Sequence, residues 1–241
     1  MEPIVEGEEI EKADEAEPRP FPATLADAAI GFLVGLLGST LLGALVFVVL
    51  GDDSELAVTG ASLIGLWIGL VWAATRASRK RGTGSIRRDF GVSITWGDLW
   101  LGLLGGAGVQ SIVAVMYLPF PELNDELSAP ARELAGQAPD RAGLLALSAL
   151  VVIGAPMFEE IFFRGMLLGA LRRLGSPVAV LLSAVAFSLS HFGQFLAVPA
   201  FVVLGVVLAL FTLGRGRVGP AIVTHATFNA ITMAVLLASA S

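Results

Sequence analysis

The chain has 241 residues, of which 55% are apolar and only 15% charged, and its mean hydropathy is +0.80. A soluble domain carries about 25% charged residues, so this composition excludes an ordinary soluble globular protein. The absence of cysteine excludes disulfides and thiolate metal sites. The net charge of −6 reflects an acidic N-terminal segment, because eight of the 21 acidic residues fall within the first 17 positions. The remainder is close to neutral, and we expect no nucleic-acid partner.

The N-terminal segment 1–22 is acidic and Pro-punctuated, which predicts a disordered tail. From residue 23 to 241 we expect one membrane-embedded domain, because apolar runs of about 18 to 25 residues recur along it. No cleavable signal peptide is evident, so the first run is expected to act as the insertion signal. The fold class is therefore all-α, a polytopic bundle of about seven transmembrane helices, with spans near 25–50, 57–75, 97–118, 143–170, 177–193, 195–213 and 218–238.

Basic residues indicate the orientation of these spans. The loop after the second span, RASRKRGTGSIRRDFG, is strongly basic, and arginine pairs follow the fourth and sixth spans. With seven spans these three loops lie on one side, which the positive-inside rule makes cytoplasmic. The N-terminus is then cytoplasmic and the C-terminus external. Segment 119–141 is the one long polar excursion on the opposite side. Its two Pro-separated pieces are candidates for short helices at the interface, and between a connector and a lid we favour the connector.

Glycine pairs at GxxxG spacing occur in four of the expected spans: Gly31–Gly35, Gly65–Gly69, Gly102–Gly106 and Gly165–Gly169. Small residues at this spacing let two helix backbones approach closely. We expect them to support helix packing within the bundle. They do not by themselves indicate dimerisation.

Few ionisable side chains lie well inside the spans: Glu159, Glu160, Arg164 and the two histidines, His191 and His225. A charge at mid-bilayer costs about 2.5–3.5 kcal/mol on insertion scales, so such groups usually face the protein interior and serve a function. At 1.5 Å per helical residue, all of them fall within one broad layer of the membrane. This common depth predicts a single buried site assembled from three helices.

Helical spacing sorts these groups into pairs. Residues four apart share a helix face, so Glu160 can pair with Arg164. Glu159 is rotated by about 100° from its neighbour and needs another partner. By the same spacing His225 shares a face with Asn229. Phe187 likewise shares a face with His191 in the fifth span.

These side chains contain the parts of a hydrolytic site. A carboxylate beside a neutral imidazole can deprotonate water held between them, and a second imidazole with an amide can donate hydrogen bonds to an oxyanion. Glu159, His191, His225 and Asn229 thus contain the parts needed to hydrolyse a peptide bond. Two histidines and a glutamate also form a common catalytic zinc set, so Glu159, His191 and His225 are the ligands if zinc or another divalent metal is bound. The sequence lacks the usual His-Glu-x-x-His helix of zinc proteases, and both alternatives stay open at this point.

Three motifs in chain order carry a family resemblance: EEIFFR at 159–164, FSLSH at 187–191 and HATFN at 225–229. They match the EExxxR, FxxxH and HxxxN motifs of the CPBP (or Abi) family, the CAAX-protease and bacteriocin-processing intramembrane endopeptidases. The resemblance covers about 142–238, the expected catalytic core. It implies a glutamate-type peptidase of the Ras-converting CAAX prenyl endopeptidase type, in which Glu159 and His191 activate water and His225 and Asn229 stabilise the oxyanion. Glu160, Arg164 and Phe187 match supporting positions. The family has been described both as metalloproteases and as metal-independent glutamate proteases, and we favour metal-independent water activation.

The functional expectation is an intramembrane endopeptidase that cleaves a membrane-associated protein or peptide, with membrane lipids as its surroundings. Family analogy places it in a bacterial plasma membrane. The alternative is a non-catalytic scaffold or bacteriocin-immunity factor that binds a peptide or partner in the same cavity. A carrier that uses the carboxylates as a proton relay is disfavoured, because the two halves show no obvious internal repeat.

Overall fold

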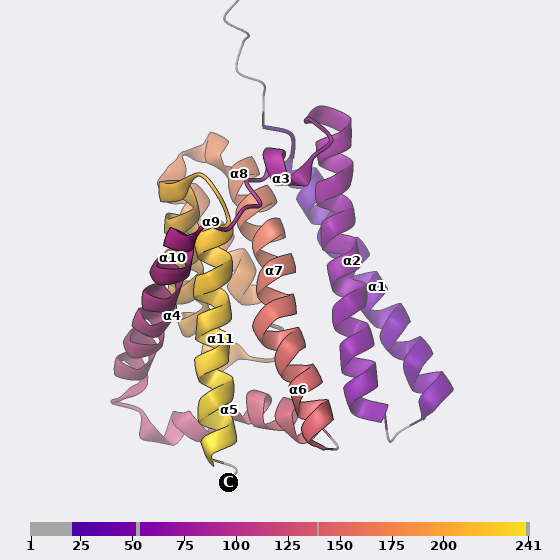
Figure 1. Cartoon of the computed structure of the whole chain (residues 1–241), viewed down its shortest axis with the longest axis vertical. Coiled ribbons are helices and arrows are strands. Elements are labelled where there is room, and N and C mark those ends of the chain that lie inside the picture. Colours follow the sequence, from indigo (N-terminus) through magenta and orange to yellow (C-terminus); the bar gives the residue numbers. More distant parts are fainter. Residues whose placement is uncertain (1–20, 52–53, 139, 240–241) are drawn as a thin grey trace, which may run out of the picture.

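The computed structural model describes residues 21–51, 54–138 and 140–239. These residues form helices and turns, and no strand occurs among them. The expected tail at 1–22 lies outside the described residues except for its last two positions. The all-helical membrane bundle predicted from the sequence is confirmed (Figure 1).

Within the described residues, five helical segments are long and apolar enough to cross a membrane. They are α1 (Leu25–Leu50), α2 (Glu55–Arg81), α4 (Trp96–Tyr117), the continuous helical segment Arg141–Leu174 and the segment Phe195–Arg215, which contains α10 (Val198–Arg215). The fifth and seventh predicted spans correspond to α9 (Ser176–Leu189) and α11 (Gly219–Ser239). At 1.5 Å per residue, the 14 residues of α9 extend only about 21 Å, which is short of a hydrocarbon core of roughly 30 Å.

The segment Arg141–Leu174 is a chain of short helical pieces. It comprises α6 (Arg141–Ala149), a π-helix at Leu150–Gly154, α7 (Ala155–Glu160), a second π-helix at Ile161–Leu167, α8 (Leu168–Leu171) and a closing 3-10 turn at Arg172–Leu174. A π turn inserts one residue into an α-helix and often occurs at functional sites. Both glutamates of the first motif lie between the two π segments.

Helices α1 and α2 form an antiparallel hairpin along one side of the bundle, and α4 packs against α11 on the other (Figure 1). Glycines make both contacts possible. A Cβ added to Gly69 would lie 2.3 Å from the Cα of Gly35, and one added to Gly106 would lie 2.5 Å from the Cβ of Thr227. Real Cβ atoms do not approach so closely, so only glycine fits at these two positions. The predicted packing role of these GxxxG pairs is confirmed.

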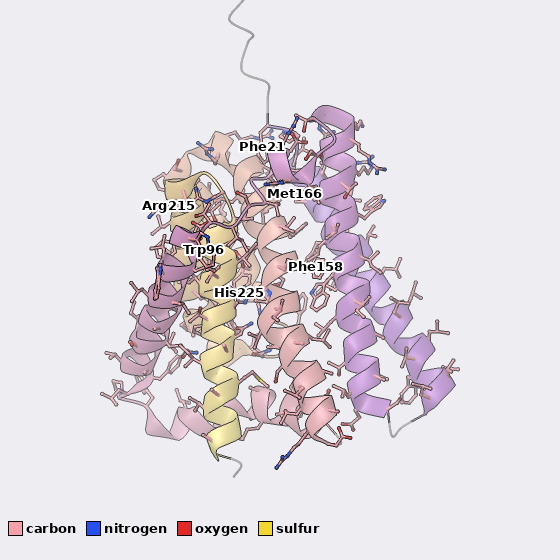
Figure 2. The ribbon with its side chains drawn as sticks, viewed as in Figure 1. Phe21, Trp96, Phe158, Met166, Arg215 and His225 are labelled. Atoms are coloured by element: carbon pink, nitrogen blue, oxygen red, sulfur yellow. The ribbon has the colours of Figure 1, made fainter. Side chains whose placement is uncertain are left out.

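The hairpin contacts the remainder of the bundle through aromatic rings. Phe158 of α7 points towards α2 (Figure 2), and its ring stacks on that of Trp67 with centroids 4.9 Å apart. Phe32 of α1 stacks on Phe162 at 6.3 Å. These contacts fix the hairpin against the long helix that carries the first motif.

The predicted basic loops gather at one end of the molecule, where α3 (Ile86–Asp89), the end of α8 and the α10–α11 turn lie together (Figure 1). The backbone N–H of Val218 donates to the carbonyl of Gly91 at 3.0 Å, which joins two of these loops directly. The polar segment 119–141 lies at the opposite end. Its ordered part is a single helix, α5 (Pro121–Gly136), and not the two short helices expected from its prolines.

Candidate active site

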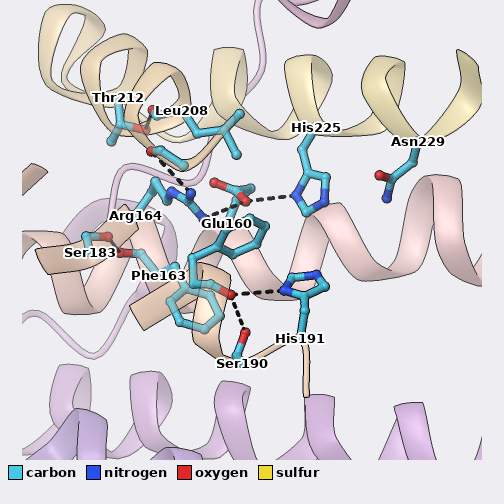
Figure 3. Close-up of polar contacts among 12 residues, drawn as sticks. Glu160, Phe163, Arg164, Ser183, Ser190, His191, Leu208, Thr212, His225 and Asn229 are labelled. Carbon is cyan, nitrogen blue, oxygen red and sulfur yellow. Dashed lines mark hydrogen bonds and ion pairs between the residues drawn. The ribbon is translucent and has the colours of Figure 1, made fainter. Parts of the chain in front are cut away.

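The carboxylate of Glu160 lies at the centre of a buried polar cluster (Figure 3). Its Oε1 accepts a hydrogen bond from Arg164 Nη1 at 3.0 Å, and the Nδ1 of His225 lies 2.9 Å from the same oxygen. The side chains of Glu160 and Arg164 are both 0% exposed. Arg164 also donates from Nη2 to the carbonyl of Gly205 on α10 at 3.3 Å. The predicted Glu160–Arg164 pair is confirmed, and His225 joins it.

These hydrogen bonds connect three helical segments around the Glu160–Arg164 ion pair. A buried charge is tolerated only when it is paired and hydrogen-bonded. Glu160 and Arg164 come from the long helix, His225 from α11 and the Gly205 carbonyl from α10. The cluster therefore fixes the position of α11 relative to the long helix at the level of the motifs.

Phe187 is the common packing partner of the charged and imidazole groups. Its ring meets His191 and His225 edge-on, with centroids 4.9 and 5.4 Å away. The guanidinium carbon of Arg164 lies 4.3 Å from the same ring centroid, which is cation–π geometry. Phe187 is itself fully buried. It is predicted from the sequence as a supporting residue, and the structure places it between the two histidines and the arginine.

His191 lies in a turn just beyond α9, which ends at Leu189. The prediction that the fifth span continues to residue 193 is therefore wrong. The carbonyl of Phe187 is contacted by the Ser190 hydroxyl at 2.7 Å and by His191 Nδ1 at 3.0 Å. Such side-chain hydrogen bonds compete with continuation of the helix, and Gly193 then takes a positive φ of 85°.

The Nδ1 contact fixes the tautomer of His191. A carbonyl oxygen only accepts hydrogen bonds, so Nδ1 must carry the proton. In the neutral ring Nε2 is then unprotonated and able to accept a proton. This is the form that a general base requires.

Glu159 and Asn229 are placed differently from the residues of the buried cluster. One oxygen of Glu159, Oε2, is buried and has no hydrogen-bond partner in the described part of the chain. No hydrogen bond joins Glu159 to His191 or His225 among the described residues. Asn229 donates from Nδ2 to the carbonyl of Val151, in the first π segment, at 2.8 Å. The structure thus anchors Asn229 to the helix that carries Glu159, but in the described part of the chain Glu159 is hydrogen-bonded to neither histidine.

Solvent exposure divides the seven motif residues into two groups. Four are fully or almost fully buried, and three are partly exposed. The buried group is Glu160, Arg164, Phe187 and His225; the partly exposed group is Glu159, His191 and Asn229. The first group has the character of a structural support, and the second lies at the edge of the buried cluster, where each residue keeps some exposed surface.

The alternative of a metal centre requires at least three ligating side chains close together. No group of three or more histidine, aspartate and glutamate side chains in the described part of the chain is placed to hold a metal ion. Glu159, His191 and His225 do not form such a group here. The Nδ1 of His225 is already engaged by Glu160.

Three contributions to the site are not evident from the sequence. Phe201 of α10 stacks on the His191 ring, with centroids 4.2 Å apart. Gly205 and Val151 contribute carbonyl oxygens to Arg164 and Asn229. None of the three stands out from its apolar surroundings in the sequence.

The part of the chain that carries this site is also the part that matches a known protein family. The model of the family described as Type II CAAX prenyl endopeptidase Rce1-like matches residues 141–231. The resemblance to the CPBP membrane proteases is confirmed over these residues. The match contains the whole of the long helix, α9 and α10, together with α11 as far as Ile231. No curated protein and no solved structure matches the chain.

Proposed function

We propose that this protein is an intramembrane endopeptidase that hydrolyses a peptide bond of a membrane-associated protein or peptide. The family match supports membrane protease activity in general. The observation that carries the proposal is the tautomer of His191, whose Nδ1 proton leaves Nε2 able to accept a proton, together with a Glu159 carboxylate that is not part of the buried ion-pair cluster.

Glu159 and His191 are assigned to water activation. Both are partly exposed, and His191 presents an unprotonated Nε2 because its Nδ1 donates to Phe187. A direct Glu159–His191 hydrogen bond would leave no room for water between them, so its absence is compatible with a bridging nucleophile. One of the two groups takes a proton from the water as its oxygen attacks the carbonyl carbon, and the proton then passes to the leaving amine as the C–N bond breaks.

His225 and Asn229 are assigned to the oxyanion that forms on the substrate. The contact of Nδ1 with Glu160 holds the His225 ring, and the assignment requires that its Nε2 donate to the oxyanion. Asn229 has two amide hydrogens, of which Val151 takes one, so the second can reach the substrate oxygen. Preorganised donors of this kind typically contribute about 10²–10³-fold to turnover.

Glu160, Arg164 and Phe187 act as positioning residues in this proposal. Their buried cluster holds His225 from one side and His191 from the other. They do not touch the reacting atoms themselves. A metal ion is not required by this assignment, and dependence on zinc or another divalent metal is a separate experimental question.

The proposed setting is a bacterial plasma membrane with the N-terminus cytoplasmic and the C-terminus external. This orientation is supported by the gathering of the basic loops at one end of the bundle. The multi-pass character follows from the apolar helices themselves. The substrate is proposed only as a membrane-associated polypeptide, with no assignment of a prenyl group.

The decisive experiment compares the N-termini of membrane proteins and peptides from cells that carry the wild type, Glu159→Gln or Glu55→Gln. Glu55 is an exposed residue at the start of α2, remote from the motifs, so it is a matched control for loss of one carboxylate. We expect one or more new N-termini that depend on Glu159 and persist in the Glu55 variant. A cellular phenotype that survives Glu159→Gln, His191→Ala and His225→Ala would instead favour the scaffold or immunity factor.

A further inference from the structure

A cavity of about 210 Å³ lies at the basic end of the bundle, away from the partly exposed motif residues. It is bounded by α3, by the second π segment with α8, and by the α10–α11 turn. This volume exceeds the roughly 150 Å³ of an engineered protein cavity that accepts benzene, so it can hold a small ligand group. The residues that give it its chemistry are Phe21, Arg88, Leu168, Arg172, Leu213 and Arg217.

The arginines of this cavity differ in whether their charges are already paired with a carboxylate. Arg217 makes a two-pronged ion pair with Asp98, with Nη2 and Nε at 2.7 and 2.9 Å from its oxygens. The Asp98 carboxylate raises the pKa of Arg217, which therefore stays charged. Arg88 and Arg172 are exposed and make no ion pair with a described residue. Two positive charges are thus available to a ligand at the mouth.

The acidic residue in the same wall has hydrogen-bond partners of its own. Asp89 accepts hydrogen bonds from the Ser78 hydroxyl and from the backbone N–H of Thr83. These bonds fasten α3 to the end of α2. Its carboxylate is therefore held towards the α2–α3 loop.

The inner end of the cavity is formed by Arg164 and Gly165 of the long helix. The Nε of Arg164 is buried and has no hydrogen-bond partner in the described part of the chain. A buried donor without a partner is uncommon in native structures and is a reason to look for a ligand. Arg164 thus adds a third arginine with an unused donor to the residues that line the cavity, besides Arg88 and Arg172.

A second hollow of about 600 Å³ adjoins the first. The two share Phe21, Gly169 and Arg172, and the second adds Arg173. Phe21 lies at this end of the molecule, next to α3 and α8 (Figure 2). The combined space has positive charge at its rim and apolar walls beside it, which suits an amphipathic ligand.

We propose that this cavity binds the phosphate-bearing headgroup of an anionic membrane lipid. Arg88 and Arg172 bind the phosphate at the mouth, and the apolar wall that includes Phe21, Leu168 and Leu213 lies against the glycerol and the first acyl carbons. The position at the ends of the apolar helices is the depth at which lipid phosphates lie. Basic pockets between transmembrane helices on the cytoplasmic side are known to bind such headgroups. The proposal does not depend on the protease assignment.

The test is a titration of the purified full-length protein in detergent with phosphatidylglycerol or phosphatidylcholine, with bound lipid counted by native mass spectrometry. Wild type is compared with Arg88→Gln/Arg172→Gln and with Arg87→Gln/Arg215→Gln. Arg87 and Arg215 are also exposed, and their substitution removes the same charge. Neither of them lines either hollow. We expect preferential binding of phosphatidylglycerol, a weakening of roughly thirtyfold in the first variant, and less than threefold in the second.

Three results would overturn the proposal. Equal weakening in the two double variants would mean a diffuse basic surface and no built site. Binding of inorganic phosphate or glycerol phosphate as tight as that of the lipid would make a free anion the ligand. The third arm is a full-length variant with Glu6, Glu8, Glu9 and Glu11 changed to Gln. If only that variant binds phosphatidylglycerol, the acidic N-terminal segment itself occupies the arginines.

Discussion

The same substitution at the two adjacent glutamates of the first motif should affect different properties, stability at one position and activity at the other. Glu160→Gln keeps the shape of the side chain but removes the charge that Arg164 and His225 share. Glu159→Gln removes a carboxylate that has no ion pair and no hydrogen bond in the described part of the chain. We therefore expect Glu160→Gln to lower the free energy of unfolding, and Glu159→Gln to lower activity with little change in stability.

The size of the effect follows from the geometry of the cluster. Unit charges 3.0 Å apart interact by about 5 kcal/mol at an effective dielectric constant of about 20. Removal of one member of a buried ion pair typically destabilises by about 3–5 kcal/mol, because the other charge is left uncompensated. Glutamine still accepts one hydrogen bond, so we expect about 3 kcal/mol for Glu160→Gln. For Glu159→Gln we expect less than about 1 kcal/mol.

Reversible unfolding in mixed detergent micelles would measure both values against wild type. The double variant Glu160→Gln/Arg164→Met provides an internal check, since it also removes the uncompensated guanidinium. It should recover at least half of the stability lost in Glu160→Gln. The reasoning is refuted if Glu160→Gln is as stable as wild type, or if Glu159→Gln is equally destabilised.

Three further predictions concern packing, the oxyanion and metal dependence. Gly69→Ala should destabilise the α1–α2 hairpin by about 1–3 kcal/mol, because its Cβ would overlap the Gly35 backbone, whereas Gly108→Ala has nothing within 4 Å and should change stability by less than about 0.5 kcal/mol in the same unfolding assay. Asn229→Ala should reduce kcat for a cleaved reporter peptide by about 10²–10³-fold while lowering stability by only about 1 kcal/mol through loss of the Val151 contact; equal activity would remove Asn229 from the oxyanion site. Cleavage by the purified protein should continue after dialysis against a chelator, and restoration of lost activity by zinc alone would establish the metal-dependent alternative.

Several features of this protein could be predicted from the sequence because they depend on local periodicity and composition. Apolar runs long enough to span a bilayer fixed the fold class and the positions of the helices. The spacing of four residues between Glu160 and Arg164 predicted their ion pair, which forms even though a π-helix begins at Ile161. The GxxxG pairs predicted close contacts within the bundle, and the basic loops predicted that one end would collect positive charge.

Other features depend on contacts between helices that are distant in the chain. The sequence places His225 and Asn229 on one helix face. In the fold, His225 is hydrogen-bonded to Glu160, 65 residues earlier, and Asn229 is hydrogen-bonded to the carbonyl of Val151. The end of α9 before His191 was missed, because it depends on two side-chain hydrogen bonds to one carbonyl. The aromatic neighbours of His191 could not be identified either, since Phe201 is one of 14 phenylalanines with nothing local to distinguish it.

The sequence by itself thus determined which polar groups enter the membrane and at what depth, because both follow from helix length and the high free energy of an isolated charge in hydrocarbon. Only the tertiary structure decided which of those groups neutralise one another and which remain partly exposed. The physical reason is that one carboxylate oxygen, Oε1 of Glu160, can accept hydrogen bonds from side chains of two different helices at once. Once Glu160 binds both Arg164 and His225, Glu159 is the carboxylate of the pair that neither side chain engages.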